Sequence, residues 1–525
     1  MASDLGAQDG VPGEGVEDLM HGTGDSSEGG RVSFPDAAKA AKELVILSSL
    51  TASLTSVLLG YDVGVMAGAI VYIKADLQLS TLQAAVIVSS LNMVAAPGAV
   101  LAGSVSDFFG RKRAIGTACL IFIGGSLLKI MSTGFGVLLF GRIITGVGVG
   151  CGFQVSPVYI AEITPPNLRG MLTGLTDICI NLGIVIGYLV AYIVAELANS
   201  DGEAWRIMLA ISLFPPFVIL AFLAALPESP RWLVAQGLTR DAYSVMQQIT
   251  PPEEGSSEME DVVKRQLEAM QASVEEETHS LSWGQVLCSP VPIVRRTVLL
   301  GLGLGIAQQI SGSESVVYYS PSVLEAAGID STTEVLMANV AVGLAKLLGE
   351  IVGVGLTDHT GRRPLFLLSS TLVTISLFVI TVCFWASANP LVTLLGLCSF
   401  MFVFSLGMGP LTFVAASEVL PLQCRGKGVS LTVFANRLLS GLIALSFPLL
   451  AEGFTVGGTF FFFFFLSCGT IKFYSACVPE TRGKTLEAIT RELELELSPL
   501  SPPRSPTVAQ ATDADVTSGS NPALL

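Results

Sequence analysis

The stretch GSVSDFFGRKR at residues 103–113 returns, with changes, as VGLTDHTGRRP at residues 354–364. Both copies place an aspartate, Asp107 or Asp358, three residues before the sequence Gly-Arg and a second basic residue. Each copy follows a long apolar segment, which places it at the end of a hydrophobic stretch. Self-similarity of this kind indicates that one structural unit occurs twice in the chain.

Two further pairs of sequences support the repeat. YIAEITPPNLRG at 159–170 and VAASEVLPLQCRG at 414–426 each place a glutamate seven residues before Arg-Gly. PESPRW at 227–232 and PETRGK at 479–484 form a weaker pair. The pairs follow one another in the same order, so we predict that the second half of the chain repeats the first.

The composition of the 525-residue chain is that of a membrane protein with many crossings. Hydrophobic residues make up 51% and charged residues 14% of the chain, and its mean hydropathy of +0.66 is too high for an ordinary soluble domain. A bilayer core about 30 Å thick needs roughly 20 apolar helical residues, and a helix is required there because it satisfies its own backbone. The twelve predicted helical spans are 44–66, 84–106, 114–132, 136–159, 172–195, 206–226, 297–319, 335–357, 364–386, 391–416, 428–451 and 456–478.

Lysine and arginine in the short connections predict the orientation of these helices, because they mark the cytoplasmic side. The connections after the second, fourth, eighth and tenth spans are the basic ones, so both termini and the long middle segment are predicted to be cytoplasmic. The repeated motifs then fall at the cytoplasmic ends of even-numbered helices. The predicted fold class is an all-α integral membrane protein of two parallel six-helix halves, which is the arrangement of the major facilitator fold.

This assignment divides the chain into five parts. They are a disordered acidic N-terminal tail (1–43), an N-terminal six-helix half (44–226), a cytoplasmic linker (227–296), a C-terminal six-helix half (297–478) and a cytoplasmic C-terminal tail (479–525). The tails and the linker hold much of the acidic excess behind the net charge of −15, which we interpret as solvated surface or disorder. A chain this acidic is not expected to bind nucleic acid.

Sequence signals of catalysis and of metal binding are not found. The chain has no HExxH or GxSxG sequence, and its nine cysteines, mostly within apolar spans, form no disulfide framework or metal pair. We therefore expect a protein that is not an enzyme and that holds no cofactor or metal ion.

Further motifs resemble the sugar porter family of the major facilitator superfamily over about residues 44–490. They are GYDVGV, GRIITGVGVG, PVYIAEITPPNLRG, PESPRWL, QQISG, YYSP, GRRPL, SEVLP and VPETRGKTLE. Within that family, VAVGLAK, NRLLSGLIALSF and the acid in QQISGSE resemble the plant-type polyol and monosaccharide proton symporters. The resemblance implies proton-coupled uptake of polyols or monosaccharides by alternating access, in a multi-pass protein of the plasma membrane. A facilitative carrier and a non-transporting sugar sensor stay open as alternatives.

The sequence QQISGSESVVYYSP at 308–321 brings many hydrogen-bonding side chains into a membrane-length apolar stretch. The family pattern assigns Gln308 and Gln309 to substrate binding, because an amide offers both a donor and an acceptor to neighbouring hydroxyl groups. Glu314 and Tyr318 follow in the same run and are predicted to join them. Polar packing between helices is the alternative interpretation of the run.

Departures from the hexose-porter pattern narrow the expected substrate. Glu314 and Asp177 occur where hexose porters usually have amides, and a carboxylate accepts two hydroxyl groups at once, which suits the vicinal diols of a polyol. Either acid is alternatively a protonated structural group or a partner of Lys346. Phe413 stands where many family members have tryptophan and keeps an aromatic face. The resemblance also assigns Asn436 to the pocket.

Asp62 is the predicted proton-coupling residue. An aspartate at the centre of a membrane helix costs about 2.5–3.5 kcal/mol on insertion scales and is normally functional. Arg142 falls in the outer half of the fourth span, at a similar depth, so the two side chains can meet. The resemblance implies a switch in which protonation of Asp62 releases Arg142, and a static buried ion pair is the alternative.

Charged residues of the repeated motifs predict a gate at the cytoplasmic side. Single surface ion pairs are weak, so only a network that spans both halves would close the inner end while the outer end is open. The predicted gate residues are Asp107, Arg111, Glu162, Arg169 and Glu228 in the first half and Asp358, Arg362, Glu418, Arg425 and Glu480 in the second. His359 departs from the basic residue that often follows the aspartate. The expected partners are a small polyhydroxylated solute, a proton and the lipid bilayer.

Overall fold

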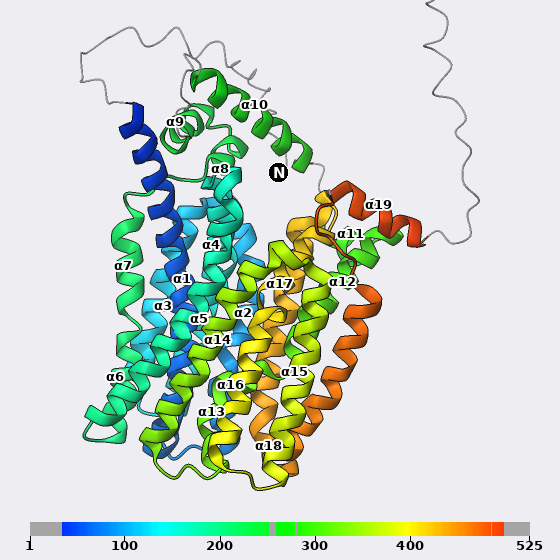
Figure 1. Cartoon of the computed structure of the whole chain (residues 1–525). Coiled ribbons are helices and arrows are strands. Elements are labelled where there is room, and N and C mark those ends of the chain that lie inside the picture. Colours follow the sequence, from blue (N-terminus) through cyan, green and yellow to red (C-terminus); the bar gives the residue numbers. More distant parts are fainter. Residues whose placement is uncertain (1–33, 251–258, 279–280, 485, 498–525) are drawn as a thin grey trace, which may run out of the picture.

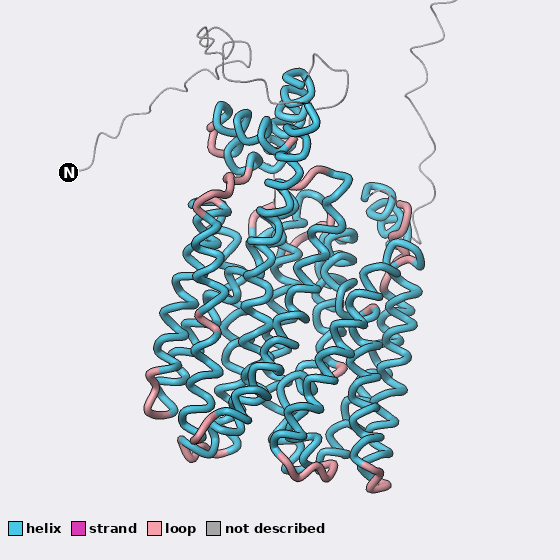
Figure 2. The backbone as a smooth tube through the Cα atoms, turned by 60° about the vertical axis from the view of Figure 1, so that its left-hand side comes forward, coloured by secondary structure: helices cyan, strands magenta, loops and turns pink. Residues whose placement is uncertain are grey.

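The structure is a computed structural model that describes residues 34–250, 259–278, 281–484 and 486–497. Within these residues the regular elements are helices, most of which lie side by side in one bundle (Figures 1 and 2). The first part of the bundle consists of α1 (Phe34–Asp76), α2 (Thr81–Phe109), α3 (Arg111–Ile130), α4 (Phe135–Ile163), α5 (Pro166–Leu197), α6 (Asp201–Ile211) and α7 (Phe214–Leu223).

The middle segment and the second part of the bundle follow. The middle segment contains α8 (Pro230–Ala235), α9 (Thr239–Ile249), α10 (Met259–Thr278) and α11 (Trp283–Leu287). The second part consists of α12 (Pro292–Ile310), α13 (Ser313–Ala326), α14 (Thr332–Thr360), α15 (Arg362–Trp385), α16 (Pro390–Leu406), α17 (Met408–Val419) and α18 (Arg425–Cys477). A short helix, α19 (Leu486–Leu497), ends the described chain.

The helices account for twelve membrane crossings. Ten stretches of the described residues are long and apolar enough to cross a membrane. One of them, Leu422–Cys477, has 56 residues, which would extend about 84 Å as one straight helix. Its backbone leaves the helical conformation at Thr455 (φ 66°, ψ 164°), so this stretch supplies two crossings. The pair α12 and α13 supplies the remaining one, in agreement with the predicted fold class.

Contacts within each half are more extensive than contacts between them. In the first half α1 packs on α5, and α2 and α3 pack on α4; in the second half α14 packs on α16, and α12 and α15 pack on α18. The main contacts between the halves are α2 with α18, α5 with α14 and α1 with α13. The boundaries that we predict for the two halves remain a prediction.

Glycines allow α1 and α5 to approach each other closely. A Cβ atom on Gly60 would lie 1.9 Å from the carbonyl oxygen of Ile180, and one on Gly183 would lie 2.3 Å from that of Val57. Neither position admits a side chain, so the backbones touch there as small residues permit in membrane helices. This contact fixes the depth of α1, which carries Asp62.

The seventh and tenth crossings are interrupted, where the sequence predicts continuous spans. α12 and α13 meet at Gly312, which adopts φ +77°, and α16 and α17 meet at Gly407. Hydropathy averaged over about 20 residues does not locate such breaks, because each span as a whole stays apolar. An interrupted helix leaves backbone polar groups without helical partners, which membrane proteins tolerate only where other groups satisfy them or a cavity adjoins.

Short helices gather at one end of the bundle, the end predicted to be cytoplasmic, which we call the inner end (Figure 1). α8, α9 and α10 share an apolar cluster that includes Leu233, Met246 and Leu267, and α19 packs against α12 and α17. α1 begins at Phe34, so residues 34–43 are helical and the predicted disordered tail is wrong for them. Alanine- and lysine-rich sequence favours helix there. The rest of the predicted tail, like the end of the C-terminal one, lies outside the described residues.

Candidate functional site

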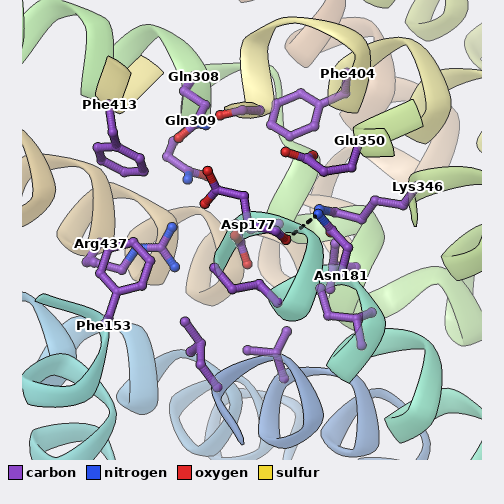
Figure 3. Close-up of a pocket in the computed structure, with 17 residues that line it drawn as sticks. Phe153, Asp177, Asn181, Gln308, Gln309, Lys346, Glu350, Phe404, Phe413 and Arg437 are labelled. Carbon is purple, nitrogen blue, oxygen red and sulfur yellow. Dashed lines mark hydrogen bonds between the residues drawn. The ribbon is translucent and has the colours of Figure 1, made fainter. Parts of the chain in front are cut away.

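A cavity of about 80 Å³ lies between the two halves of the bundle. Its walls come from α1, α4 and α5 of the first half and from α12, α13, α14, α16, α17 and α18 of the second. Five of the predicted substrate residues line it, and Figure 3 labels four of these. They are Asp177, Gln308, Gln309, Glu314 and Phe413.

The two glutamines of the cavity have different environments. Nε2 of Gln308 donates to the carbonyl oxygens of Met408 (3.0 Å) and Gly409 (2.9 Å), at the break between α16 and α17. Its Oε1 accepts from Nδ2 of Asn436 (2.5 Å). Gln309 donates through Nε2 to Oδ1 of Asn436 (3.2 Å), and its buried Oε1 has no partner within the described residues. Gln308 therefore stabilises the broken helix, whereas Gln309 keeps a free acceptor at the cavity wall.

Asn436 and Tyr318, the other two predicted ligands, do not line the cavity. Asn436 is fully buried behind the glutamines and orients both of them. The hydroxyl group of Tyr318 is buried and accepts from Nδ2 of Asn92 on α2 (3.3 Å). Because Tyr318 follows the break at Gly312, helical spacing from the glutamines does not determine where it points.

Three charged side chains that the sequence reasoning did not assign to the site also line the cavity. Lys346 and Glu350 come from α14 and Arg437 comes from α18. Nζ of Lys346 donates to Oδ1 of Asn181, and the described part of the chain shows no ion pair between Lys346 and Asp177. All three stand within predicted apolar spans, where ionisable residues are functional by default. That signal was available in the sequence.

Phe153 and Phe413 close one side of the cavity by a contact between the halves. Their ring centroids are 5.8 Å apart at an interplanar angle of 71°, an edge-to-face arrangement that aromatic pairs prefer. The guanidinium group of Arg437 lies 5.2 Å from the centre of the Phe153 ring (Figure 3). Nε and Nη2 of Arg437 both donate to Oδ1 of Asn436 (3.2 and 2.9 Å). Phe413 therefore contributes to the contact between the two halves in this conformation, in addition to filling space.

Asp62 and Arg142 form a fully buried ion pair beside the cavity. Nη1 of Arg142 donates to Oδ2 of Asp62, and both side chains are 0% exposed. Nε and Nη2 of the same guanidinium group donate to the α2 carbonyl oxygens of Ile87 (3.1 Å) and Val88 (3.2 Å). The predicted contact between Asp62 and Arg142 is confirmed, and their role in coupling stays a prediction.

A second cation, which the sequence reasoning missed, contacts the same carboxylate. Nζ of Lys129, on α3, lies 2.5 Å from Oδ1 of Asp62, and this side chain is also 0% exposed. A lysine in the last turn of a membrane helix usually extends to the interface, so its position did not suggest burial. Only the packing of α3 against α1 and α4 turns it inward.

Arg111, at the start of α3, forms the centre of a charged cluster at the inner end. Its Nε and Nη2 bind the two carboxylate oxygens of Glu162 (2.9 and 3.1 Å), and its Nη1 binds Asp107 (2.9 Å). Glu228 accepts from the backbone N–H groups of Arg111 (3.0 Å) and Lys112 (3.1 Å), as an acid at a helix N-terminus should. These contacts tie together α2, α3, α4 and the segment after α7.

The second half repeats this cluster. Nη2 of Arg362 binds Oε1 of Glu418 (2.9 Å), and Glu480 accepts from the backbone N–H groups of Arg362 and Arg363 (both 3.1 Å) at the start of α15. Partial burial by itself raises the pKa of Glu480, but the backbone N–H donors around it lower that pKa below its usual value. The equivalent roles of Glu228 and Glu480 confirm the predicted repeat at these positions.

The remaining predicted gate residues make local contacts. Arg169 and Arg425 each donate to the backbone carbonyl group five residues earlier, 3.4 and 3.3 Å away, and Arg425 has further interactions. The side chain of Asp358 lies outside the described part of the structure. The ion pairs given above each join residues of one half, so a network that spans the halves stays a prediction.

Comparison with known proteins identifies the family. Residues 48–493 match the family described as sugar (and other) transporter, and the chain belongs to this family. Two proteins of Arabidopsis thaliana are similar over most of their lengths. Probable polyol transporter 4 is 39% identical over 455 residues, which are 85% of each chain. Putative polyol transporter 1 is 37% identical over 459 residues, which are 84% of this chain and 89% of the relative.

A solved structure shows the same fold. It is the major facilitator superfamily proton:xylose symporter XylE of E. coli bound to 6-bromo-6-deoxy-D-glucose, with a TM-score of 0.73 and 26% sequence identity. The match covers 86% of this chain and 99% of that chain. Family and fold together define a multi-pass membrane transporter rather than an enzyme.

Proposed function

We propose that the protein takes up polyols and monosaccharides together with protons, by alternating access between the halves 44–226 and 297–478. The observation that carries this proposal is the cavity between the halves, which is lined by Gln309, whose Oε1 has no partner within the described residues, and by the acids Asp177 and Glu314. The names of the relatives, polyol transporters and a proton:xylose symporter, support the same class of solute.

The side chains of the cavity suit a solute that carries many hydroxyl groups. Each hydroxyl group that leaves water unpaired costs about 1–3 kcal/mol, so the wall must supply a partner for each. Asp177, Glu314 and Gln309 supply acceptors, and Lys346 and Arg437 supply donors. Because a carboxylate accepts from two adjacent hydroxyl groups, the pair of acids favours linear polyols and cyclitols.

Asp62 supplies the coupling in this proposal because it shares a helix with the cavity wall. Leu59 and Val63 of α1 line the cavity on either side of it in sequence. Arg142 links Asp62 on α1 to carbonyl oxygens on α2. A proton that neutralises the carboxylate weakens this link and frees α1 to close on the solute.

Contacts on the two sides of the cavity provide the alternation. On the outer side, the hydroxyl group of Tyr188 donates to the carbonyl oxygen of Val317 (2.6 Å), and both residues are buried. On the inner side, Phe153 meets Phe413, and both are partly exposed. Alternating access requires that these two sets of contacts open in turn.

Solute-evoked current and uptake in oocytes that express the protein test the proposal. A panel of sorbitol, mannitol, myo-inositol, xylitol, glucose and fructose is applied at acid and at neutral external pH to the wild type and to Asp62→Asn. We expect an inward current with a polyol that grows at acid pH and is lost in the variant. The exposed residue Asp201 provides the matched control, Asp201→Asn, which should behave as the wild type.

The alternatives give different results in the same experiment. Uptake that is equal at both pH values and survives Asp62→Asn identifies a facilitative carrier. A protein that reaches the surface and moves none of the six solutes is a sensor or serves another solute. We also propose that the protein works in the plasma membrane, as its resemblance to uptake carriers implies, and a fluorescent fusion in the native cell tests this.

A further inference from the structure

Lys129 completes a buried cluster in which one carboxylate faces two cations. Asp62 offers Oδ1 to Lys129 (2.5 Å) and Oδ2 to Arg142. Arg142 has two further acceptors in the carbonyl oxygens of α2. For the ammonium group of Lys129 the structure describes, besides Asp62, only the face of the Phe122 ring, 5.3 Å from Nζ. Its charge is therefore the least stabilised of the three.

A cluster of this composition cannot simply gain a proton at Asp62. If Lys129 stayed charged, protonation of Asp62 would leave two buried cations around a neutral acid. Such uncompensated buried charges are strongly destabilising. Arginine does not release its proton in proteins, whereas a buried lysine does so readily. Lys129 and Asp62 are therefore the two groups whose proton content can change.

We propose that Lys129 and Asp62 hold the coupling proton jointly, so that the exchangeable unit is the pair rather than the carboxylate alone. In the empty state Lys129 is a neutral amine and Asp62 is paired with Arg142. One incoming proton converts the amine to an ammonium group. Transfer of that proton from Nζ to Oδ1 restores the amine, forms the carboxylic acid and releases Arg142, with no second proton required.

This inference rests on the proposed proton coupling and adds the residue that sets its pH range. Asp62 on α1 is the charged group in direct contact with Lys129, and Arg142 on α4 contacts the same carboxylate. α2 faces the cluster with carbonyl oxygens, and α7 has no charged residue. Other titratable or charged groups on the elements around the pair include Tyr61 of α1, Asp177 of α5, Arg206 of α6, and Glu314 and Tyr318 of α13.

The pH dependence of solute-evoked current distinguishes this role from that of a fixed cation. In Lys129→Met the proton must bind directly to a carboxylate held by Arg142, which has a lower proton affinity than an amine. We expect the pH of half-maximal current to move by about one unit or more toward acid. In Lys129→Arg the second charge is permanent, so we expect proton-driven uptake to fall at least about tenfold. Solute exchange at equal concentrations, which needs no net proton movement, should persist in both.

The opposite shift would overturn the inference. If Lys129 is a permanent cation, its removal takes a positive charge from beside Asp62, and the midpoint moves toward alkaline pH. An unchanged midpoint also contradicts the proposal. Lys42→Met, at an exposed lysine on α1, controls for the substitution itself, and retained solute exchange shows that the variants fold. If the wild-type current does not depend on pH, the proposed coupling fails instead, which is a separate result.

Discussion

Gln308 and Gln309 are adjacent and chemically identical, yet their surroundings give them different tasks. Both donors of Gln308 are used by the carbonyl oxygens of Met408 and Gly409, so this side chain supports the backbone. Gln309 has one committed donor and one free acceptor. The sequence predicts both as ligands because the family pattern does not distinguish them.

Substituting each glutamine separately should distinguish the two tasks. In Gln309→Met the solute loses one hydrogen bond, worth about 1 kcal/mol or somewhat more, so we expect KM to rise between fivefold and tenfold while thermal stability is retained. In Gln308→Met two backbone carbonyl groups lose their donors, so we expect a lower Tm. Uptake kinetics in proteoliposomes and melting in detergent provide the measurements. A wild-type KM in Gln309→Met would remove this residue from the site.

The break between α12 and α13 is the element that turns a membrane crossing into a cavity wall. Gly312 adopts φ +77° there, and a Cβ atom on it would lie 2.8 Å from the ring of Phe463. Glu314 falls in the first turn of α13, where the positive end of the helix dipole stabilises a carboxylate. The break therefore lies among residues that line the cavity, Gln308, Gln309 and Glu314, and it supports the charge of Glu314.

Replacing the glycine at the break should damage both folding and transport. In Gly312→Ala the left-handed conformation costs roughly 1–2 kcal/mol, and the contact with Phe463 adds to it. We expect a lower Tm and reduced uptake. Gly355→Ala, in α14, is the matched control because a Cβ atom there meets nothing within 4 Å. The double variant Gly312→Ala with Phe463→Leu should recover part of the loss, and full recovery would show that the backbone conformation is irrelevant.

At the level of the whole molecule, the two halves carry equivalent charged clusters at the same end. Arg111 and Arg362 each bind a glutamate of a neighbouring helix, Glu162 and Glu418, within their own half. Such clusters hold each six-helix half together as a unit. That rigidity suits a mechanism in which the halves move against each other. The predicted gate network between the halves would act in addition to these clusters.

Double-mutant cycles distinguish ion pairs within one half from a gate network that spans the two halves. Arg111 and Glu162 are only 11% and 9% exposed and make two charge-assisted hydrogen bonds, so we expect a coupling of about 2 kcal/mol in the free energy of unfolding. Arg111 and Glu418, in different halves, should show coupling near zero. Both coupling energies are obtained from unfolding in mixed micelles. The variants are Arg111→Gln, Glu162→Gln, Glu418→Gln and the two doubles that combine Arg111→Gln with either glutamate substitution. Strong coupling between Arg111 and Glu418 would instead support a gate network that spans the halves.

Much of the architecture could be predicted because it depends on local properties of the chain. Hydropathy over about 20 residues marks the crossings, basic residues in short loops set the orientation, and the repeated motifs reveal the two halves. The residue types of the candidate site were also visible. Asp62, Arg142, Gln309 and Asp177 stand in apolar stretches where polar groups need a reason.

The tertiary structure was needed wherever a property depends on residues that are distant in the sequence. Lys129 is buried against Asp62 only because α3 packs beside α1 and α4. Tyr318 turns away from the cavity because the chain breaks before it, and Arg437 of α18 lies over the ring of Phe153, which belongs to the other half. Hydropathy and spacing describe one helix at a time, whereas the partner of a buried charge is selected by the packing of several.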